Sequence, residues 1–267
     1  MKHVCFFLSL VLTWAGSTPV LAQVGADGSN AFAQTTQIIV VTTPGWNAVD
    51  GQLQRYERAT LRDAWRPVGG PISVVVGRNG LSWGIGVVAP SDPGVRPTPD
   101  PVKREGDGKA PAGVFALGTA FGYAPQPMPG LKLPYLALTP SIECVDDMSS
   151  KYYNRVVDRA IVTPDWNSSE HMRNIAQYRW GIVVGLNGIV AEGRASPTAP
   201  GAGSCVFLHI WLGPGQGTAG CTAMPQSQLE TLLTWLDPKR RPLLVQLPVT
   251  AYTRLINRWR LPRLIGQ

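Results

Sequence analysis

Short apolar runs separated by turn-forming residues dominate the pattern of hydrophobic and polar positions along this chain. The runs are rich in β-branched and aromatic residues, and Gly, Pro or Asn bounds them, which is typical of β-strands. Asn79-Gly80 and Asn187-Gly188 lie between apolar runs and predict two tight hairpin turns. The pattern predicts a mainly β fold. The expected strands cover residues 38–41, 72–76, 83–88, 114–117, 136–138, 180–184, 189–190 and 206–208.

Helical periodicity is confined to a few segments. Residues 225–236 begin with a proline and carry leucines at helical spacing, which predicts a helix just downstream of Cys221. A second helix is expected over residues 250–259, where the arginines would form a solvated basic face. Residues 165–178 are a candidate for a third, short helix. The sequence therefore predicts two or three short helices beside the strands.

The first 22 residues have the parts of a secretory signal peptide. Lys2 and His3 precede a short apolar core, and small residues end the segment at Ala22. We expect cleavage after Ala22, a flexible leader of small and polar residues over 23–36, and a single domain over 37–267. No segment is long and apolar enough to suggest a membrane span. The expected location is the periplasm or cell envelope.

Charge narrows the choice of partners. The chain has 24 Lys and Arg against 17 Asp and Glu, a formal net charge of +7, and the basic residues are dispersed. For an exported protein this favours anionic cell-wall polymers or lipopolysaccharide over nucleic acid, with simple solubility as the alternative.

The cysteine count indicates one disulfide and one free thiol. Cys5 lies in the expected signal peptide, which leaves Cys144, Cys205 and Cys221 in an oxidising compartment. A disulfide between Cys144 and Cys205 is the pairing that leaves Cys221 available.

Cys221 and His209 are the candidate catalytic residues. His209 ends an apolar, strand-like run twelve residues before Cys221, and a loop of small residues joins them. Because a free thiol has a pKa of about 8.5, a nearby histidine base makes cysteine a useful nucleophile. Amides around Gly220 and Cys221 would form an oxyanion hole. The segment has no second histidine and no paired cysteines, which disfavours a metal site, and no cofactor is indicated.

Two segments resemble the L,D-transpeptidase catalytic domain family (YkuD-like), in particular an exported bacterial branch. Residues 103–115 read KREGDGKAPAGVF, similar to the family's K-x-E-G-D-G-x-T-P-x-G-x-F, and residues 209–221 are similar to its His...(Ser/Thr)-x-Gly-Cys signature. Segments around 144–154 and 178–184 also resemble that branch. The resemblance spans roughly residues 100–247 and implies a β-sandwich of short mixed strands.

The resemblance also implies a reaction. Cys221 would be the nucleophile and His209 the general base, with Gly220 in the oxyanion loop. The thiolate would attack a peptidoglycan stem peptide at the carbonyl of its third residue, a diamino acid, and expel D-alanine. The amine of a second stem would then resolve the thioester into a 3-3 crosslink. A wall-attached protein amine is an alternative acceptor. In the family a backbone carbonyl orients the histidine, and the sequence does not place it here.

Side chains for the ammonium group of the diamino acid are expected near the second segment. Carboxylates and polar groups suit a cation, so Asp146, Asp147, Tyr153 and Asn154 are candidates, with turn formation and helix capping as the equal alternative. Residues 103–113 are interpreted as a structural loop, and His171 as a surface or capping residue.

The chain departs from the family pattern at two places. Ile210 follows His209 where many relatives have glycine, and Ala223 stands where they have arginine. The missing cation leaves open whether the acyl-enzyme is resolved by an amine or by water, as in an L,D-carboxypeptidase, or whether the protein only binds the wall. Four residues are candidates to replace the arginine in space: Arg155, Arg159, Lys109 and Arg179.

Overall fold

The computed structural model describes residues 29–188 and 198–265 and is mainly β, as predicted. The principal sheet has ten strands. Eight of them follow the order β10 (Trp180–Val184), β11 (Phe207–Ile210), β12 (Thr222–Met224), β3 (Arg66–Val75), β2 (Asp50–Glu57), β1 (Gln37–Thr43), β13 (Leu243–Pro248) and β5 (Ala110–Gly122). The short strands β4 (Leu81–Trp83) and β6 (Tyr135–Ala137) also pair with β5.

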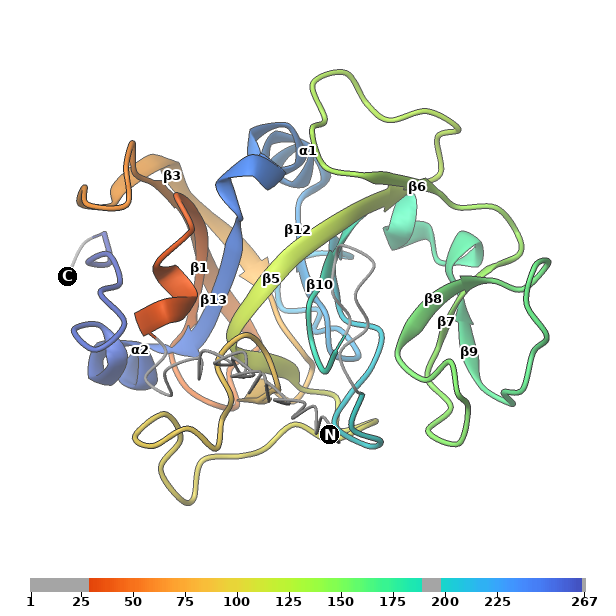
Figure 1. Cartoon of the computed structure of the whole chain (residues 1–267), viewed down its shortest axis with the longest axis horizontal. Helices are drawn as coiled ribbons and strands as arrows, with labels where there is room; N and C mark the ends of the chain where they lie inside the picture. The colour runs from red at the N-terminus through yellow and green to blue at the C-terminus, as the bar shows by residue number, and fades with distance from the viewer. Residues whose placement is uncertain (1–28, 189–197, 266–267) are drawn as a thin grey trace, which may run out of the picture.

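The sheet closes into a barrel, so the sandwich arrangement is not confirmed. Closure depends on β5, which has 13 residues and crosses the molecule in Figure 1. Its residues 113–116 pair with β13, and residues 117–122 pair with β10 at the other end of the strand order. Because one long strand serves both neighbours, the sheet has no open edge between β13 and β10.

The core fills the barrel and the space beneath its helices. β1 pairs in parallel with β13 and antiparallel with β2, and Ile38, Ile39, Val40 and Val41 are all buried. A continuous apolar run of this kind indicates a strand covered on both faces. The helix predicted over residues 225–236 is confirmed as α1 (Gln226–Trp235), which packs on β10 and β11.

The second predicted helix is confirmed in part, because α2 (Val249–Leu255) ends four residues early. The third is wrong. In its place lie β9 (Ser169–His171) and the short 3₁₀ turns η2 (Met172–Asn174) and η3 (Ala176–Arg179). β9 pairs with another strand, and this tertiary pairing overrides the local helical pattern. A further 3₁₀ turn, η4 (Pro238–Arg240), precedes β13.

A small second sheet lies beside the barrel, at the right of Figure 1. Its order is β8 (Arg155–Asp158), β7 (Ile142–Val145) and β9, all antiparallel. Cys144 of β7 forms a disulfide with Cys205, two residues before β11. The disulfide therefore attaches the small sheet to the barrel strand that carries His209.

Part of the expected leader and the turn expected at Asn79-Gly80 lie within the described residues. The expected signal peptide and the run 189–190 lie outside the described residues. Residues 29–36, part of the expected flexible leader, contain η1 (Ser29–Phe32), and Phe32 is buried against Trp259. Asn79-Gly80 forms a tight turn, with the amide of Gly80 donating to the carbonyl of Gly77.

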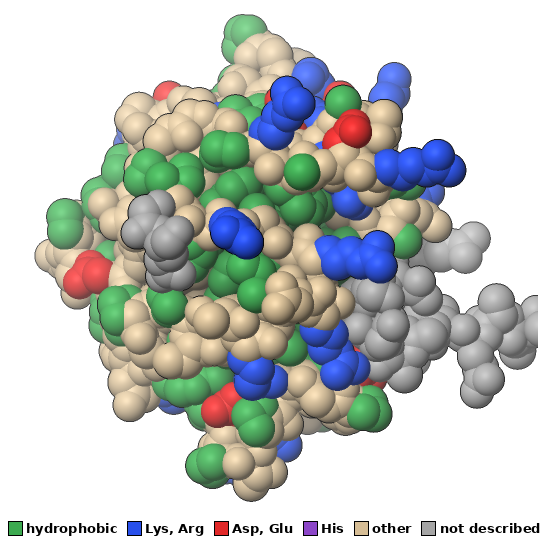
Figure 2. Space-filling view, turned by 90° about the vertical axis from the view of Figure 1, so that its left-hand side faces the viewer, with side chains coloured by type: hydrophobic (Ala, Val, Ile, Leu, Met, Phe, Trp, Pro, Cys, Tyr) green, Lys and Arg blue, Asp and Glu red, His purple; other side chains and the backbone are tan. Residues whose placement is uncertain are grey.

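The surface matches the dispersed basic residues of the sequence. Figure 2 shows Lys and Arg side chains spaced among apolar and uncharged ones on the side of the molecule where α2 lies. No helix within residues 29–188 and 198–265 is long and apolar enough to cross a membrane.

Candidate active site

His209 and Cys221 lie on adjoining segments of the barrel. β11 and β12 are parallel neighbours, with Leu208 opposite Thr222 and His209 opposite Ala223. Cys221 is the residue immediately before β12, and its Sγ accepts a hydrogen bond of 3.3 Å from the amide of Phe207 on β11. Both side chains line one cavity of about 460 Å³. The structure thus brings together the two residues on which the sequence hypothesis depends.

The tautomer of His209 follows from a single hydrogen bond. Its Nδ1 lies 2.7 Å from the carbonyl oxygen of Ile210. A carbonyl oxygen only accepts, so Nδ1 carries the proton and Nε2 keeps its lone pair. Burial lowers the pKa of His209 to about 4, which keeps the ring neutral at physiological pH. The residue after the histidine therefore supplies the orienting carbonyl that the sequence did not locate.

The Cys221 thiol is also neutral in this arrangement. It is free and buried, and Sγ lies 3.6 Å from the carbonyl oxygen of Cys205, to which it donates. Burial, and after it the negative charge of Glu170, raise the pKa of Cys221 to about 12, against smaller opposing effects of hydrogen bonds from Phe207 and Tyr178 and of the charge of Lys103. A thiolate therefore requires transfer of the thiol proton to a base, and His209, which lines the same cavity, keeps a lone pair on Nε2.

The loop before Cys221 is tightly built. The Thr218 hydroxyl donates to the carbonyl of Cys221 at 2.6 Å and accepts from the amide of Gly220 at 3.1 Å. Gly220 lines the cavity, but its amide is already engaged with Thr218. A role for Gly220 in binding an oxyanion remains a prediction that would require this bond to rearrange.

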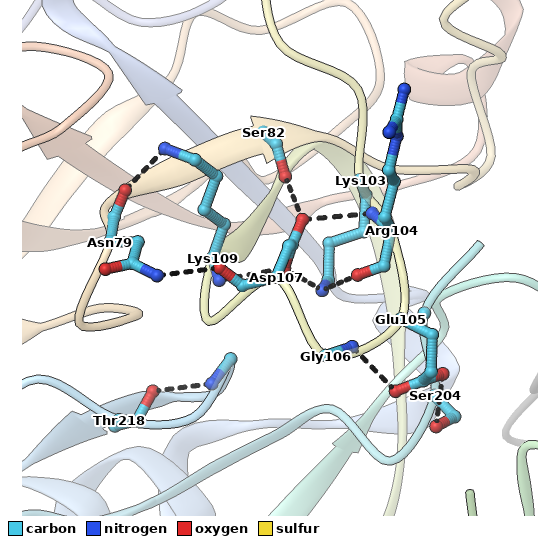
Figure 3. Close-up of polar contacts among 12 residues, drawn as sticks. Asn79, Ser82, Lys103, Arg104, Glu105, Gly106, Asp107, Lys109, Ser204 and Thr218 are labelled. Carbon is cyan, nitrogen blue, oxygen red and sulfur yellow. Dashed lines mark hydrogen bonds and ion pairs between the residues drawn. The ribbon is translucent and has the colours of Figure 1, made fainter. Parts of the chain in front are cut away.

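The cations of the cavity are Arg78 and Lys103. Lys103 is buried and paired with Asp107, and its Nζ also donates to the carbonyl of Arg104, as Figure 3 shows. Arg78 is exposed beside Thr218, whose carbonyl accepts from the Arg78 amide at 2.8 Å. None of the four sequence candidates for the missing arginine lines this cavity: Arg155, Arg159, Lys109 and Arg179.

The four candidate substrate-binding residues separate in the structure. Asp146 lines the cavity, and its Oδ1 is buried without a hydrogen-bond partner. Tyr153 is buried and donates to Glu105, a cavity residue. Asn154 is fully buried and accepts from the amide of Cys205 at 3.1 Å, so it holds the disulfide loop.

Asp147 does not line the cavity and has a turn-forming role. Its side chain accepts from the hydroxyl and the amide of Ser149 and from the amide of Asn167, and these hydrogen bonds lower the pKa of Asp147 to about 2. His171 is half-exposed and lies 3.1 Å from Glu143, away from the cavity.

The charged and hydrogen-bonding cavity residues that escaped the sequence reasoning include Arg78, Glu105, Glu170 and Tyr178. Glu105 lies within the motif interpreted as a structural loop. Glu170 and Tyr178 lie in the segment expected to be a helix, which hid the alternation that turns Glu170 toward the cavity. Among the described residues, no group of three or more His, Cys, Asp or Glu side chains could hold a metal ion.

Neither a protein-family model, a curated protein nor a solved structure matches this chain.

Proposed function

We propose that the protein is an exported cysteine L,D-transpeptidase that acts on peptidoglycan stem peptides through a thioester. One observation supports this most strongly. A free thiol and an imidazole whose Nδ1 is fixed on a backbone carbonyl line the same cavity from adjacent segments. This arrangement supplies a nucleophile and a base of defined tautomer.

The proposed chemistry begins with neutral groups. As Sγ of Cys221 attacks the carbonyl carbon of the third stem residue, the thiol proton moves to Nε2 of His209. The tetrahedral intermediate collapses, and the His209 imidazolium protonates the leaving amine of D-alanine. The acceptor amine then attacks the thioester, its proton passes to His209, and Sγ leaves and regains a proton. Burial of both groups holds the site neutral until substrate binds.

The charges in the cavity fit a zwitterionic peptide. Glu105, Asp146 and Glu170 offer carboxyl groups to the ammonium group of a diamino acid, and the side chain of Arg78 offers a cation to a carboxylate. Arg78 is the better candidate for the missing family arginine, because Lys103 is already neutralised by Asp107.

A second candidate is a wall-binding protein without turnover. The raised pKa of Cys221 and the lowered pKa of His209 favour it, since neither group is charged at rest.

The deciding experiment is intact-mass spectrometry of the mature chain with tetrapeptide muropeptides, followed by analysis of the muropeptides. An adduct and crosslinked dimers, both absent in Cys221→Ala, are expected. A Glu230→Gln variant on α1, outside the cavity, is the matched control and should behave as wild type. Tripeptide alone would identify a carboxypeptidase. Muropeptide retention with neither adduct nor product would identify a wall-binding protein.

A further inference from the structure

Glu170 is a carboxyl group in the cavity that takes no part in the proton transfers of the proposed reaction. It lies in the middle of β9, directly opposite Cys144 on β7, and it lines the cavity together with Cys221. Removal from water, with a smaller contribution from the nearby charges of Asp146 and Glu105, raises the pKa of Glu170 to about 7, against the opposing effect of a hydrogen bond from Tyr178. Glu170 can therefore exist in either protonation state near neutral pH.

Tyr178 connects Glu170 to the catalytic pair. Its hydroxyl donates to Oε2 of Glu170 at 2.7 Å and also lies within hydrogen-bonding reach of Sγ of Cys221. The Tyr178 ring is buried and packs edge-on against His209, with 5.3 Å between the ring centroids. Three contacts thus hold the hydroxyl between the carboxyl group and the thiol.

The hydroxyl has one proton and two possible acceptors. When Glu170 is ionised, it accepts the hydrogen bond from the Tyr178 hydroxyl, and the Cys221 thiol donates its own hydrogen bond to the carbonyl of Cys205. When Glu170 is protonated, its own O–H donates to the Tyr178 oxygen, and the Tyr178 proton is free to donate to a thiolate. The protonated state of Glu170 also removes a negative charge that opposes the thiolate.

We propose that Glu170 and Tyr178 are a positioning pair that controls the reactivity of Cys221: the thiolate is stabilised when Glu170 is protonated and Tyr178 donates to Sγ. The inference rests on the proposed role of Cys221 as the nucleophile.

The charged groups around Glu170 come from several segments. Asp146, which follows β7, and Glu105, in the loop before β5, both oppose its ionisation. Lys103, from the same loop, favours a Cys221 thiolate but is paired with Asp107. His209 on β11 is neutral. His171, the residue after Glu170, lies against Glu143 and does not line the cavity. Arg78 also lines the cavity, but it is exposed to solvent. The thiolate therefore faces Glu170 with little buried positive charge to compensate.

The test measures alkylation of Cys221 by iodoacetamide from pH 5 to pH 9, using the disulfide-intact mature chain and intact-mass detection. In wild type, the increase in rate with pH should flatten near pH 7, because ionisation of Glu170 offsets deprotonation of the thiol. Glu170→Gln keeps a donor to Tyr178 but has no charge. It should rise without flattening and react roughly tenfold faster at pH 8, with little change at pH 5.

Tyr178→Phe should change the alkylation rate in the opposite direction and at the opposite end of the pH range. Loss of the hydroxyl should slow alkylation severalfold at pH 5 and change it little at pH 8. Glu230→Gln is the matched control for loss of a carboxylate outside the cavity and should follow wild type. The ultraviolet absorbance of the thiolate, with Cys221→Ala as the blank, gives the same titration if alkylation is slow.

A flattening that persists in Glu170→Gln would overturn the inference, as would equal rate changes at all pH values in either variant. Alkylation needs no peptidoglycan substrate. A failed muropeptide assay together with the expected alkylation profiles would contradict the proposed function alone. A successful muropeptide assay without those alkylation profiles would contradict this inference alone.

Discussion

The two faces of the small sheet hold carboxyl groups with opposite surroundings. On the face away from the cavity, Glu143 is 1% exposed and accepts from Ser169, Trp166 and Arg159. Burial alone would raise the pKa of Glu143, but these donors outweigh it and the pKa is lowered. On the cavity face, Glu170 has a single side-chain donor among the described residues, Tyr178, and its pKa is raised to about 7.

The difference shows how donors decide the role of a buried carboxylate. Glu143 and Glu170 lie one residue apart in the register of β7 and β9 and share the same backbone framework. Because several donors satisfy its carboxylate oxygens, Glu143 stays ionised and holds the sheet together. The Glu170 carboxyl group, with fewer donors, can gain or lose its proton near neutral pH, which suits a group beside a nucleophile.

The largest expected effect comes from detaching the cavity face from the barrel. The disulfide closes a sequence separation of 61 residues, so replacing Cys144 and Cys205 together with serine should lower the free energy of unfolding. A chain-entropy estimate gives about 4 kcal/mol. Urea unfolding at pH 7 measures the loss, with Cys221→Ser, which keeps the disulfide, as control. Equal losses in the two variants would contradict a structural role for the disulfide.

Glu143→Ala should have the next largest effect. It leaves the partly buried donors of Trp166 and Ser169 and the Arg159 guanidinium without their acceptor, at a cost of about 3 kcal/mol. Urea unfolding at pH 7 is again the measurement. Glu143→Gln keeps one acceptor oxygen and should lose less. A cost for Glu143→Ala no greater than that of Glu230→Ala would mean that the donors are satisfied by water.

Glu170→Gln should have the opposite sign to Glu143→Ala. The folded-state pKa of Glu170, about 7, exceeds its unfolded value, so its favourable contribution is fully present below about pH 4.5 and is lost as pH rises through 7. The variant should therefore be more stable than wild type at pH 8, by about 3 kcal/mol, and similar at pH 4. Unfolding curves at both pH values test the sign. A variant that is less stable at pH 8 would show that Glu170 is fully satisfied.

Asp146→Asn should produce the smallest effect. Asp146 raises the pKa of Glu170, so its neutral isostere should lower that pKa by roughly half a unit. Carbon-detected NMR titration of the Glu170 carboxyl group measures the change. Asp147→Asn is the matched control, because Asp147 does not line the cavity and should leave the Glu170 titration unchanged. A shift of equal size in both variants would indicate a nonspecific charge effect.

Sequence reasoning located several apolar strands and missed two others, the polar β2 and the apolar β13. Residues 180–184 were predicted and form β10. β2 reads DGQLQRYE, a largely polar run, and a register shift between Leu53 and Arg55 breaks its alternation, so that Leu53 and Tyr56 are both buried although they lie three residues apart. β13 was missed as well, although it is buried along its whole length between β1 and β5. Strand pairing decides such segments, and pairing partners are distant in sequence.

The candidate site likewise has residues that the sequence indicated and residues that it did not. Cys221 and His209 stand out because a free thiol and a histidine near it in sequence have recognisable chemistry, and the odd cysteine count indicated the pair Cys144 and Cys205. The supporting groups had no such signal. The orienting carbonyl of Ile210 is backbone, and the Glu170–Tyr178 contact depends on how β9 and η3 approach β11.

The sequence by itself determined the mainly β character, the helix α1 and the catalytic candidates, because periodicity and reactive side chains are local properties. Only the tertiary structure decided barrel closure, the separation of Asp146 from Asp147 and Asn154, and the charge surroundings of Cys221. Those features depend on pairing, burial and distances between segments far apart in the chain, and burial determines the protonation state of the thiol and the imidazole.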